Sequence, residues 1–210
     1  MSQPLRRGDG LPVGLRERKK LRTRLAIQEH ALRLFREQGY ARTTVEQIAE
    51  AAEVSPSTFF RYFPTKEDVV LFDPLDPALI AAFRRQPPEL TPLRALRQAM
   101  HAVLDEAGPA SLVEQRERGR LVFEVPELQA AWLAELLRTA SIMTMLLGER
   151  SGRSPSDREV RIYAGAVMGA MMGAMVPLLT DRDADFVVEL DAALDFVEAG
   201  MPLEPAERRS

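Results

Sequence analysis

The sequence contains no cysteine and only two histidines, His30 and His101. Without cysteine the chain can form neither disulfides nor thiolate metal sites, and an intracellular location is permitted. A nucleophilic serine between a strand and a helix and a glycine-rich phosphate loop are also missing, and these are common signatures of hydrolases and nucleotide-binding enzymes. The absences predict a protein that is not an enzyme and that uses no cofactor.

Long apolar runs are nearly absent as well. Arg6 and Arg7 are not followed by a continuous apolar stretch, which argues against a secretory signal. Residues 162–180 carry no charge and approach the length that crosses a bilayer, but they are rich in Gly, Ala and Met and contain Pro177. We interpret this run as a helix buried in protein, and we expect a cytoplasmic protein without membrane contact.

The aspartates at 181, 183 and 185 have the spacing with which a calcium-binding loop begins. Such a loop requires Gly at its sixth position and Glu at its twelfth, where this sequence has Phe186 and Ala192. The aspartates are therefore predicted to cap a helix, and no metal site is expected.

A net positive charge is confined to the N-terminal region of the sequence. Residues 1–69 hold 13 Lys and Arg against 9 Asp and Glu, whereas residues 70–210 hold 15 against 22. A basic N-terminal segment favours binding to a polyanion, although a solvated tail would have the same composition.

The N-terminal third contains the pattern of several short helices. Apolar residues at 27, 31, 34 and 35 have helical spacing, and Gly39 predicts the end of that helix. Thr43 and Glu46 have the spacing of a capping box for a second helix. Ser55 followed by Pro56 then predicts the start of a third helix, which ends before Pro64.

Two short helices joined by a three-residue turn form a helix-turn-helix. In the third helix Phe59 and Phe63 are expected to face inward, which leaves the polar side chains of residues 55, 57, 58, 61 and 62 to face DNA. An ordinary amphipathic helical hairpin would show the same pattern. The spacing of polar and apolar residues therefore leaves both a DNA-binding helix-turn-helix and an ordinary hairpin open.

The remainder of the chain predicts an all-α fold. Asp73-Pro74-Leu75-Asp76-Pro77 interrupts a fourth helix, and we place a domain boundary there. The predicted organisation is a flexible basic arm over 1–15, a helix-turn-helix domain over 16–72, a helical bundle over 73–202, and a flexible tail over 203–210.

Residues 16–72 resemble the DNA-binding domain of the TetR family of transcriptional regulators. The resemblance is carried by correctly spaced stretches: Arg24 to Ile27, Ala31 to Phe35, Gly39-Tyr40, Thr43 to Val45, Ile48-Ala49, Ala52, Val54-Ser55, Thr58 to Phe63 and Lys66-Glu67. It departs from the family pattern at Phe60, where a phosphate-binding tyrosine is frequent, and at Glu53, where the turn often has glycine.

The resemblance implies which residues contact DNA. Thr44, Tyr62 and Lys66 match positions that bind phosphate in the family, and the start of the third helix matches positions that read bases. The predicted DNA-binding set is Arg24, Thr44, Ser55, Pro56, Ser57, Thr58, Arg61, Tyr62 and Lys66.

The resemblance also implies a homodimer with a ligand cavity in each C-terminal domain. Glycines repeated every four residues allow close backbone approach, and the predicted interface is Gly165, Gly169, Gly173, Leu190 and Leu194. Packing within one subunit is the alternative for this helix. The candidate cavity residues, which core packing could also explain, are Phe123, Trp132, Leu136, Met143, Met168 and Met172.

The function that follows is a ligand-responsive transcriptional regulator, most simply a repressor that binds a palindromic operator in double-stranded DNA and is released by a small hydrophobic effector. Arg116, Arg118 and Arg120 followed by apolar residues would suit an acyl-CoA, and a solvated charge run would look the same. The alternative function is a helical interaction protein without sequence-specific DNA binding. The operator, the effector and the regulated genes cannot be read from the sequence.

Overall fold

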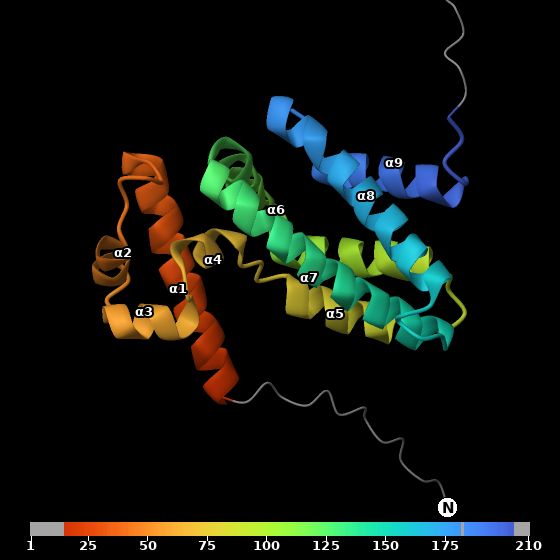
Figure 1. Ribbon diagram of the computed structural model, residues 1–210, viewed down its shortest axis with the longest axis horizontal. Coiled ribbons are helices and arrows are strands. Elements are labelled where there is room, and N and C mark those ends of the chain that lie inside the picture. Colours follow the sequence, from red (N-terminus) through yellow and green to blue (C-terminus); the bar gives the residue numbers. More distant parts are fainter. Residues whose placement is uncertain (1–14, 182, 204–210) are drawn as a thin grey trace, which may run out of the picture. The chain divides into compact units, whose positions relative to one another are not determined.

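The computed structural model describes residues 15–181 and 183–203, and within these ranges it contains helices and no strand (Figure 1). This confirms the predicted all-α fold. The chain divides into two compact units, Met1–Val69 and Val70–Ser210. The predicted arm and tail lie outside the described residues, apart from their inner ends at Leu15 and Leu203.

The first unit contains α1 (Leu15–Gln38), α2 (Val45–Ala51), α3 (Pro56–Tyr62) and the beginning of α4 (Lys66–Leu71). Its helices are held by one apolar core to which α1, α2, α3 and α4 all contribute. Fully buried side chains in it are Ile27, Ala31, Ile48, Ala49, Phe59, Phe63 and Val69. Gln28, also buried, donates a 2.9 Å hydrogen bond to the carbonyl of Val69, so that α1 satisfies a backbone acceptor of α4.

The helix boundaries of this unit follow from local chemistry, with one correction. Gly39 has φ +87°, as a helix-ending glycine requires. The capping box before α2 is formed by Thr44 and Gln47, one residue later than predicted. Thr43 is instead buried, and its hydroxyl donates to the carbonyl of Gly39 at 2.9 Å. Of two adjacent threonines, the second therefore caps the helix and the first closes the preceding loop.

The second unit is a bundle of α5 (Asp76–Arg85), α6 (Pro92–Glu124), α7 (Pro126–Ser151), α8 (Arg158–Thr180) and α9 (Phe186–Glu198). Helices α8 and α9 pack together, and α6 packs on α5, α7, α8 and α9. Apolar side chains from all five helices form a single core, which includes Phe83, Leu96, Leu147, Val167, Leu190 and Leu194.

Proline and glycine set the limits of these helices. The predicted interruption after α4 is confirmed, because α4 ends at Leu71 and α5 begins at Asp76. Within α6, Gly108 has φ +75° and Pro109 follows it, so α6 is kinked at this point. The chain divides at residues 69 and 70, slightly before the predicted boundary at 72 and 73.

Two helices of the described residues, Pro126–Ser151 and Arg158–Leu178, are long and apolar enough to cross a membrane by length and composition. Both contribute to the core of the bundle, through Leu146 and Leu147 on the first and Ala164 and Val167 on the second. The charge-free run thus packs one face against neighbouring helices and leaves the opposite face exposed in the single chain, so its interpretation as a helix buried in protein holds for one face only.

Candidate nucleic-acid interface and ligand cavity

Helix α3 has one apolar and one polar face. Phe59 and Phe63 have no exposed surface, and each ring packs against aromatic or cationic neighbours within the first unit. The predicted DNA-contacting residues of this helix divide into Ser55, Pro56, Ser57 and Arg61, which are exposed, and Thr58 and Tyr62, which are half-buried. The helix therefore presents small polar groups and one guanidinium outward.

Three hydroxyl groups form a short chain at the beginning of α3. The Ser55 hydroxyl accepts a 3.1 Å hydrogen bond from the Thr58 amide, so Ser55 caps the helix as predicted. The same oxygen lies 2.9 Å from the hydroxyls of Ser57 and Thr58. These side chains orient one another, which fixes the polar surface at the beginning of the helix.

The turn between α2 and α3 holds a non-glycine residue in a left-handed conformation. Glu53 has φ +53°, the region where glycine is favoured. The turn is closed by hydrogen bonds from the amides of Ala52, Glu53 and Val54 to carbonyls of α2. Glu53 therefore adopts a left-handed conformation in a turn that is closed by backbone hydrogen bonds.

The ammonium group of Lys66 binds other residues of the first unit. Its ammonium donates to the carbonyls of Tyr40 at 3.0 Å and Thr43 at 3.1 Å, and lies 3.9 Å from the centre of the Tyr40 ring. Tyr40 in turn donates a 2.7 Å hydrogen bond to Glu67. The sequence resemblance assigned Lys66 only to DNA; the structure adds a role in joining α4 to the loop between α1 and α2, which no local pattern indicated.

Two further predicted positions differ in accessibility. Arg24 is half-buried, with its guanidinium 5.0 Å from the centre of the Phe63 ring. Thr44 is exposed at the start of α2. Phe60, which replaces the frequent tyrosine, is 50% exposed and packs edge-on against Phe59. Phe60 therefore exposes an apolar ring that has no hydroxyl to donate a hydrogen bond to a phosphate.

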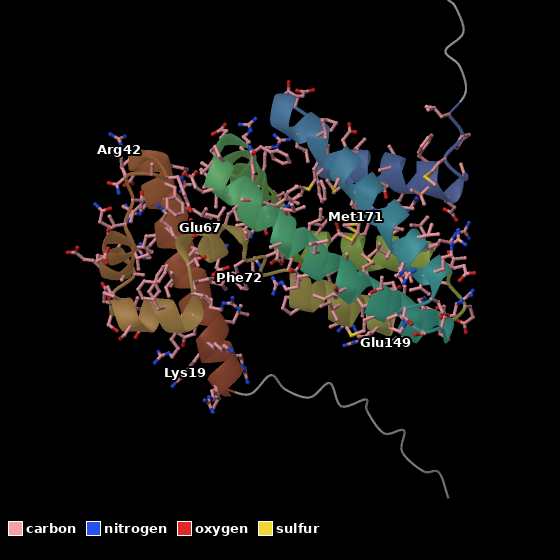
Figure 2. The ribbon with its side chains drawn as sticks, viewed as in Figure 1. Lys19, Arg42, Glu67, Phe72, Glu149 and Met171 are labelled. Carbon is pink, nitrogen blue, oxygen red and sulfur yellow. The ribbon has the colours of Figure 1, made fainter. Side chains whose placement is uncertain are left out.

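The first half of α1 carries a cluster of exposed basic side chains. Lys19 lies in this cluster, at the end of α1 where it projects beyond α3 (Figure 2). Cations near a helix N-terminus are disfavoured by the helix dipole, so the cluster is not explained by helix stability. Its exposed members are Arg16, Arg18, Lys19, Lys20 and Arg22.

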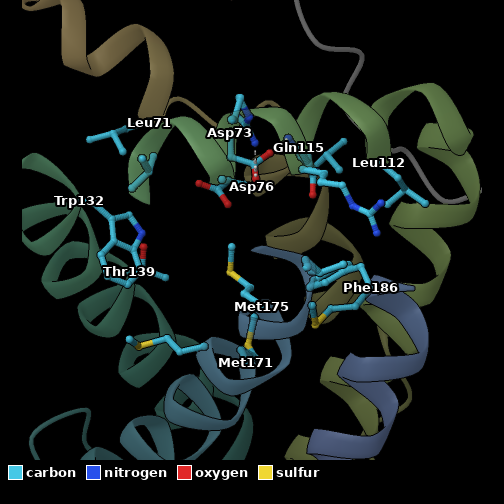
Figure 3. A pocket seen from close by; sticks show the side chains of 18 of the residues that line it. Leu71, Asp73, Asp76, Leu112, Gln115, Trp132, Thr139, Met171, Met175 and Phe186 are labelled. Atoms are coloured by element: carbon cyan, nitrogen blue, oxygen red, sulfur yellow. Dashed lines mark hydrogen bonds and ion pairs between the residues drawn. The ribbon is translucent and has the colours of Figure 1, made fainter. Parts of the chain in front are cut away.

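The second unit contains a cavity of about 560 Å³. All six predicted cavity residues line it: Phe123, Trp132, Leu136, Met143, Met168 and Met172. Met171 and Met175 lie across the cavity from Asp73 and Asp76, and Trp132 and Thr139 form another wall (Figure 3). The cavity is thus apolar over most of its wall, and Asp73 and Asp76 lie together on one side of it.

Arg118, which is buried, joins α6 to the segment that follows α4. Its guanidinium donates to the carbonyl of Phe72 and lies 3.2 Å from the carboxylate of Asp73. Arg116 donates to the carbonyl of Ala184. Both arginines line the cavity, but their guanidinium groups bind other parts of the chain, whereas Arg120 is not among the lining residues.

Asp76 is the first residue of α5 and lines the same end of the cavity. Burial by the surrounding protein, the carboxylate of Asp73 and that of Glu135 raise the pKa of Asp76 to about 6. Sequence reasoning missed Asp76, because an aspartate before proline at the start of a helix predicts only a turn.

The predicted dimer residues fall into two groups. Gly165, Gly169 and Gly173 are exposed on α8, with no atom within 4 Å of a Cβ built on any of them. Leu190 and Leu194 are instead fully buried in the core of their own unit, so their assignment to an interface is wrong. Helical spacing identified their apolar stripe correctly but not the surface that covers it.

Exposed apolar side chains accompany the glycines. Ile162 and Val176 on α8 are 60% and 56% exposed, and Val188 and Phe196 on α9 are 62% and 42% exposed. Such side chains on two adjacent helices are typical of a surface that is covered by a partner.

Of the aspartates before α9, Asp185 caps the helix as the sequence predicts, whereas Asp181 accepts from the amide of Asp183 in the preceding loop. Asp185 caps α9 by accepting from the amides of Val187 at 2.8 Å and Val188 at 3.3 Å. In the described part of the chain, no three His, Asp or Glu side chains are grouped to hold a metal ion.

Comparison with known proteins matches both units. Residues 27–71 match the family described as bacterial regulatory proteins of the tetR family, and residues 90–202 match the MftR C-terminal domain. The HTH-type transcriptional regulator TcmR of Streptomyces glaucescens is 40% identical over 194 residues, which covers 87% of this chain and 85% of TcmR.

Solved structures share the fold. The complex of SmeT with triclosan, from Stenotrophomonas maltophilia, has a TM-score of 0.58 at 20% identity and covers 89% of this chain and 100% of SmeT. The Thermus thermophilus repressor FadR, solved with lauroyl-CoA, has a TM-score of 0.55 at 22% identity and covers 89% and 99%.

Proposed function

Because this chain belongs to the TetR family of bacterial transcriptional regulators, we propose that it binds a palindromic operator in double-stranded DNA as a homodimer and is released by a small effector in its cavity. Members of the family regulate transcription rather than catalyse reactions. Repression by occupancy of the operator is the mode we infer, in the cytoplasm and without a cofactor.

The two-faced α3 helix is the observation that carries the DNA-binding proposal. A recognition helix must pack one face on its own domain while the other enters the major groove. Phe59 and Phe63 supply the packed face, and Ser57, Thr58 and Arg61 supply the reading face. Serine and threonine hydroxyls and a guanidinium can all bind base edges or phosphates, so both affinity and sequence preference can arise here.

Residues near α3 are proposed to bind the phosphates of the DNA backbone. Thr44 and Tyr62 offer hydroxyls, and the basic cluster of α1 offers cations for the flanking DNA. Each cation that neutralises a phosphate releases counterions, so DNA affinity should fall steeply with salt.

The homodimer is proposed to form through the glycine face of α8 together with α9. Close backbone approach at Gly165, Gly169 and Gly173 would bury the exposed apolar side chains of both helices. The two-fold symmetry of such a dimer would explain a palindromic operator, and two recognition helices about 34–36 Å apart would set the spacing of its half-sites.

The cavity would regulate DNA binding through the segment after α4. Arg118 binds Phe72 and Asp73 in that segment, and α4 begins at Lys66, which binds the loop between α1 and α2. A ligand that prefers a different position of Arg118 would favour a conformation of α4 with weaker DNA binding. This is a population shift, and its size is the difference in ligand affinity between the two conformations.

The DNA-binding proposal is tested with the duplex that the full chain enriches from a random pool. Replacing Arg61 by alanine should weaken binding at least about tenfold and reduce the dependence on salt by about one counterion. Arg85 is a matched control, since it is an exposed arginine on α5 in the second unit. Equal effects of Arg61→Ala and Arg85→Ala in a fluorescence anisotropy titration would contradict the assignment of α3.

A second comparison separates recognition from general attraction. Thr58→Val should change the ranking of duplexes that differ in one base pair, whereas Lys19→Ala should weaken all of them alike. If no duplex is preferred over random DNA, the alternative of a helical interaction protein is favoured.

A further inference from the structure

The charged side chains that line the cavity are, with one exception, engaged by other parts of the chain. Arg116 binds the carbonyl of Ala184, and Arg118 binds Phe72 and Asp73. Glu135 forms an ion pair with Arg138 on the same helix. Asp185 accepts two backbone amides at the start of α9. These groups are therefore unavailable as the primary partner of a ligand unless they first break contacts.

Asp76 is the exception. Among the described residues, its carboxylate makes no hydrogen bond or ion pair with another side chain or with the backbone. Its accessible surface faces the cavity, which it lines at the same end as Asp73, and the surrounding protein still buries it enough to raise its pKa. Figure 3 shows Asp76 facing the open space that Trp132 and Met175 border from other sides. A carboxylate without a partner is thus available at the end of an otherwise apolar chamber.

We propose that the cavity binds amphipathic cations, with the apolar body against the methionines and Trp132 and a protonated amine or quaternary ammonium against Asp76. The inference rests on the proposed function only for the role of the ligand, and the binding itself stands independently of DNA. An ammonium at Asp76 would also lie near Asp73, where it competes with Arg118 for that carboxylate. Such competition would loosen the contact between α6 and the segment after α4.

An acyl-CoA fits this chamber less well. Its phosphates need arginines or lysines, and both lining arginines, Arg116 and Arg118, already bind backbone carbonyls. An anionic head group placed near Asp73 and Asp76 would be repelled by both. For this cavity we therefore favour a cationic head group over the acyl-CoA that the sequence suggested.

The electrostatics of the site agree with this choice. The raised pKa of Asp76 arises from burial first and then from Asp73 and Glu135, whose effects exceed those of Arg138 and Arg118. At Asp76 the two neighbouring carboxylates thus outweigh the two nearby arginines. A cation would relieve this repulsion and favour the ionised carboxylate.

Three probes with one alkyl chain and different head groups test the proposal: decyltrimethylammonium, decanol and decanoate. Trp132 is the only tryptophan of the chain and lines the cavity, so its fluorescence reports binding to the full-length protein. At pH 7.5 the cation should bind at least about tenfold more tightly than decanol, and decanoate should bind most weakly. Equal or tighter binding of decanoate would overturn the proposal, and so would failure of all three probes to bind.

Substitution identifies the carboxylate. Asp76→Asn should remove most of the preference for decyltrimethylammonium over decanol while leaving the affinity for decanol within about twofold. Asp105→Asn is the matched control, because Asp105 is exposed on α6 and does not line the cavity. A preference for the cation that survives Asp76→Asn would place the charged contact elsewhere.

The preference should also depend on pH. Decyltrimethylammonium keeps its charge, so lowering the pH from 7.5 to 5 should weaken its binding as Asp76 takes up a proton, with no such change for decanol. The other charged groups near Asp76 are Asp73, Glu135, Arg118 and Arg138. The Asp76→Asn variant removes the main titrating group, and a pH dependence that persists in it would contradict the assignment.

Release of DNA by the ligand is measured separately from binding of the ligand. Retention of the enriched duplex, measured with and without the cation, reports whether the ligand releases DNA. If the cation binds but DNA is not released, the ligand class is upheld and its regulatory role is overturned. If decanol alone releases DNA, regulation by the cavity is upheld and the preference for a cation is overturned.

Discussion

Asp76 combines an exposed position in the cavity with a raised pKa. A raised carboxylate pKa means that the ionised form is less stable in the folded than in the unfolded chain, so Asp76 reduces stability above its unfolded pKa. The reduction is absent below about pH 4 and is complete above about pH 6, which is the pKa in the folded chain.

We therefore expect Asp76→Asn to raise the free energy of unfolding at pH 7.5 by about 1 kcal/mol, discounted for the water that reaches the carboxylate through the cavity. Urea denaturation at pH 7.5 and at pH 4 measures the effect. The gain should disappear at pH 4, and a gain that is equal at both pH values would mean that charge is not its cause.

The sequence predicts only a DNA contact for Lys66, whereas in the structure Lys66 also holds α4 to the loop between α1 and α2. Its ammonium binds two carbonyls and lies over the Tyr40 ring, so removing it leaves buried acceptors without a donor. Lys66→Met should lower the free energy of unfolding by about 2 kcal/mol. Lys20→Met, at an exposed position of α1, should leave it nearly unchanged. Similar denaturation midpoints for the two variants would restrict Lys66 to DNA contact.

At the scale of the element, the turn between α2 and α3 is the strained part of the helix-turn-helix. Glu53 has positive φ, where a side chain is disfavoured. Glu53→Gly should stabilise the protein by about 0.5–1 kcal/mol in chemical denaturation.

Glu50 provides the control for this substitution. It is exposed in the last turn of α2, so Glu50→Gly should destabilise by about 1 kcal/mol. If both glycines destabilise, the left-handed conformation of Glu53 carries no cost.

The helices were predictable from the sequence because their starts and ends depend on nearby residues. Ser55 caps α3, Asp185 caps α9, and Gly39 ends α1 as their local patterns indicate. The shift of the capping box from Thr43 to Thr44 arises because adjacent threonines offer the same chemistry, and only the loop beneath them decides which one is buried.

The cavity wall was predictable for a similar reason, whereas its chemistry was not. Large apolar and methionine side chains at helical spacing identify surfaces that face a core or chamber, and the six predicted residues line it. The contact of Arg118 with Phe72 and Asp73 joins residues more than forty positions apart, which no local pattern shows. Leu190 and Leu194 fail for the same reason, since a stripe does not reveal what packs on it.

At the scale of the whole molecule, the glycine face of α8 predicts a dimer that can be blocked without unfolding the bundle. A side chain at Gly169 would meet no atom within 4 Å in the single chain. Gly169→Glu should therefore convert dimers into monomers in sedimentation experiments while helix content is kept. Ala102→Glu, at an exposed position of α6, should stay dimeric. A dimeric Gly169→Glu protein would move the interface away from this face.

Coupling between the cavity and DNA depends on Arg118 in this account. Arg118→Met keeps the length of the side chain but removes the contacts to Phe72 and Asp73, so the effect of decyltrimethylammonium on DNA affinity should shrink at least about fivefold. Arg120→Met is the control, because Arg120 does not line the cavity. Undiminished release of DNA from Arg118→Met, at a temperature where the protein is folded, would exclude this route.

The central claim is that α3 of a homodimer reads a palindromic operator. Selection of bound duplexes from a random pool by the full-length wild-type protein tests it most directly. We predict an enriched palindrome whose half-sites are one helical turn apart, or a multiple of it, and whose affinity falls steeply with salt. Failure to enrich any sequence, while the protein remains a folded dimer, would contradict it.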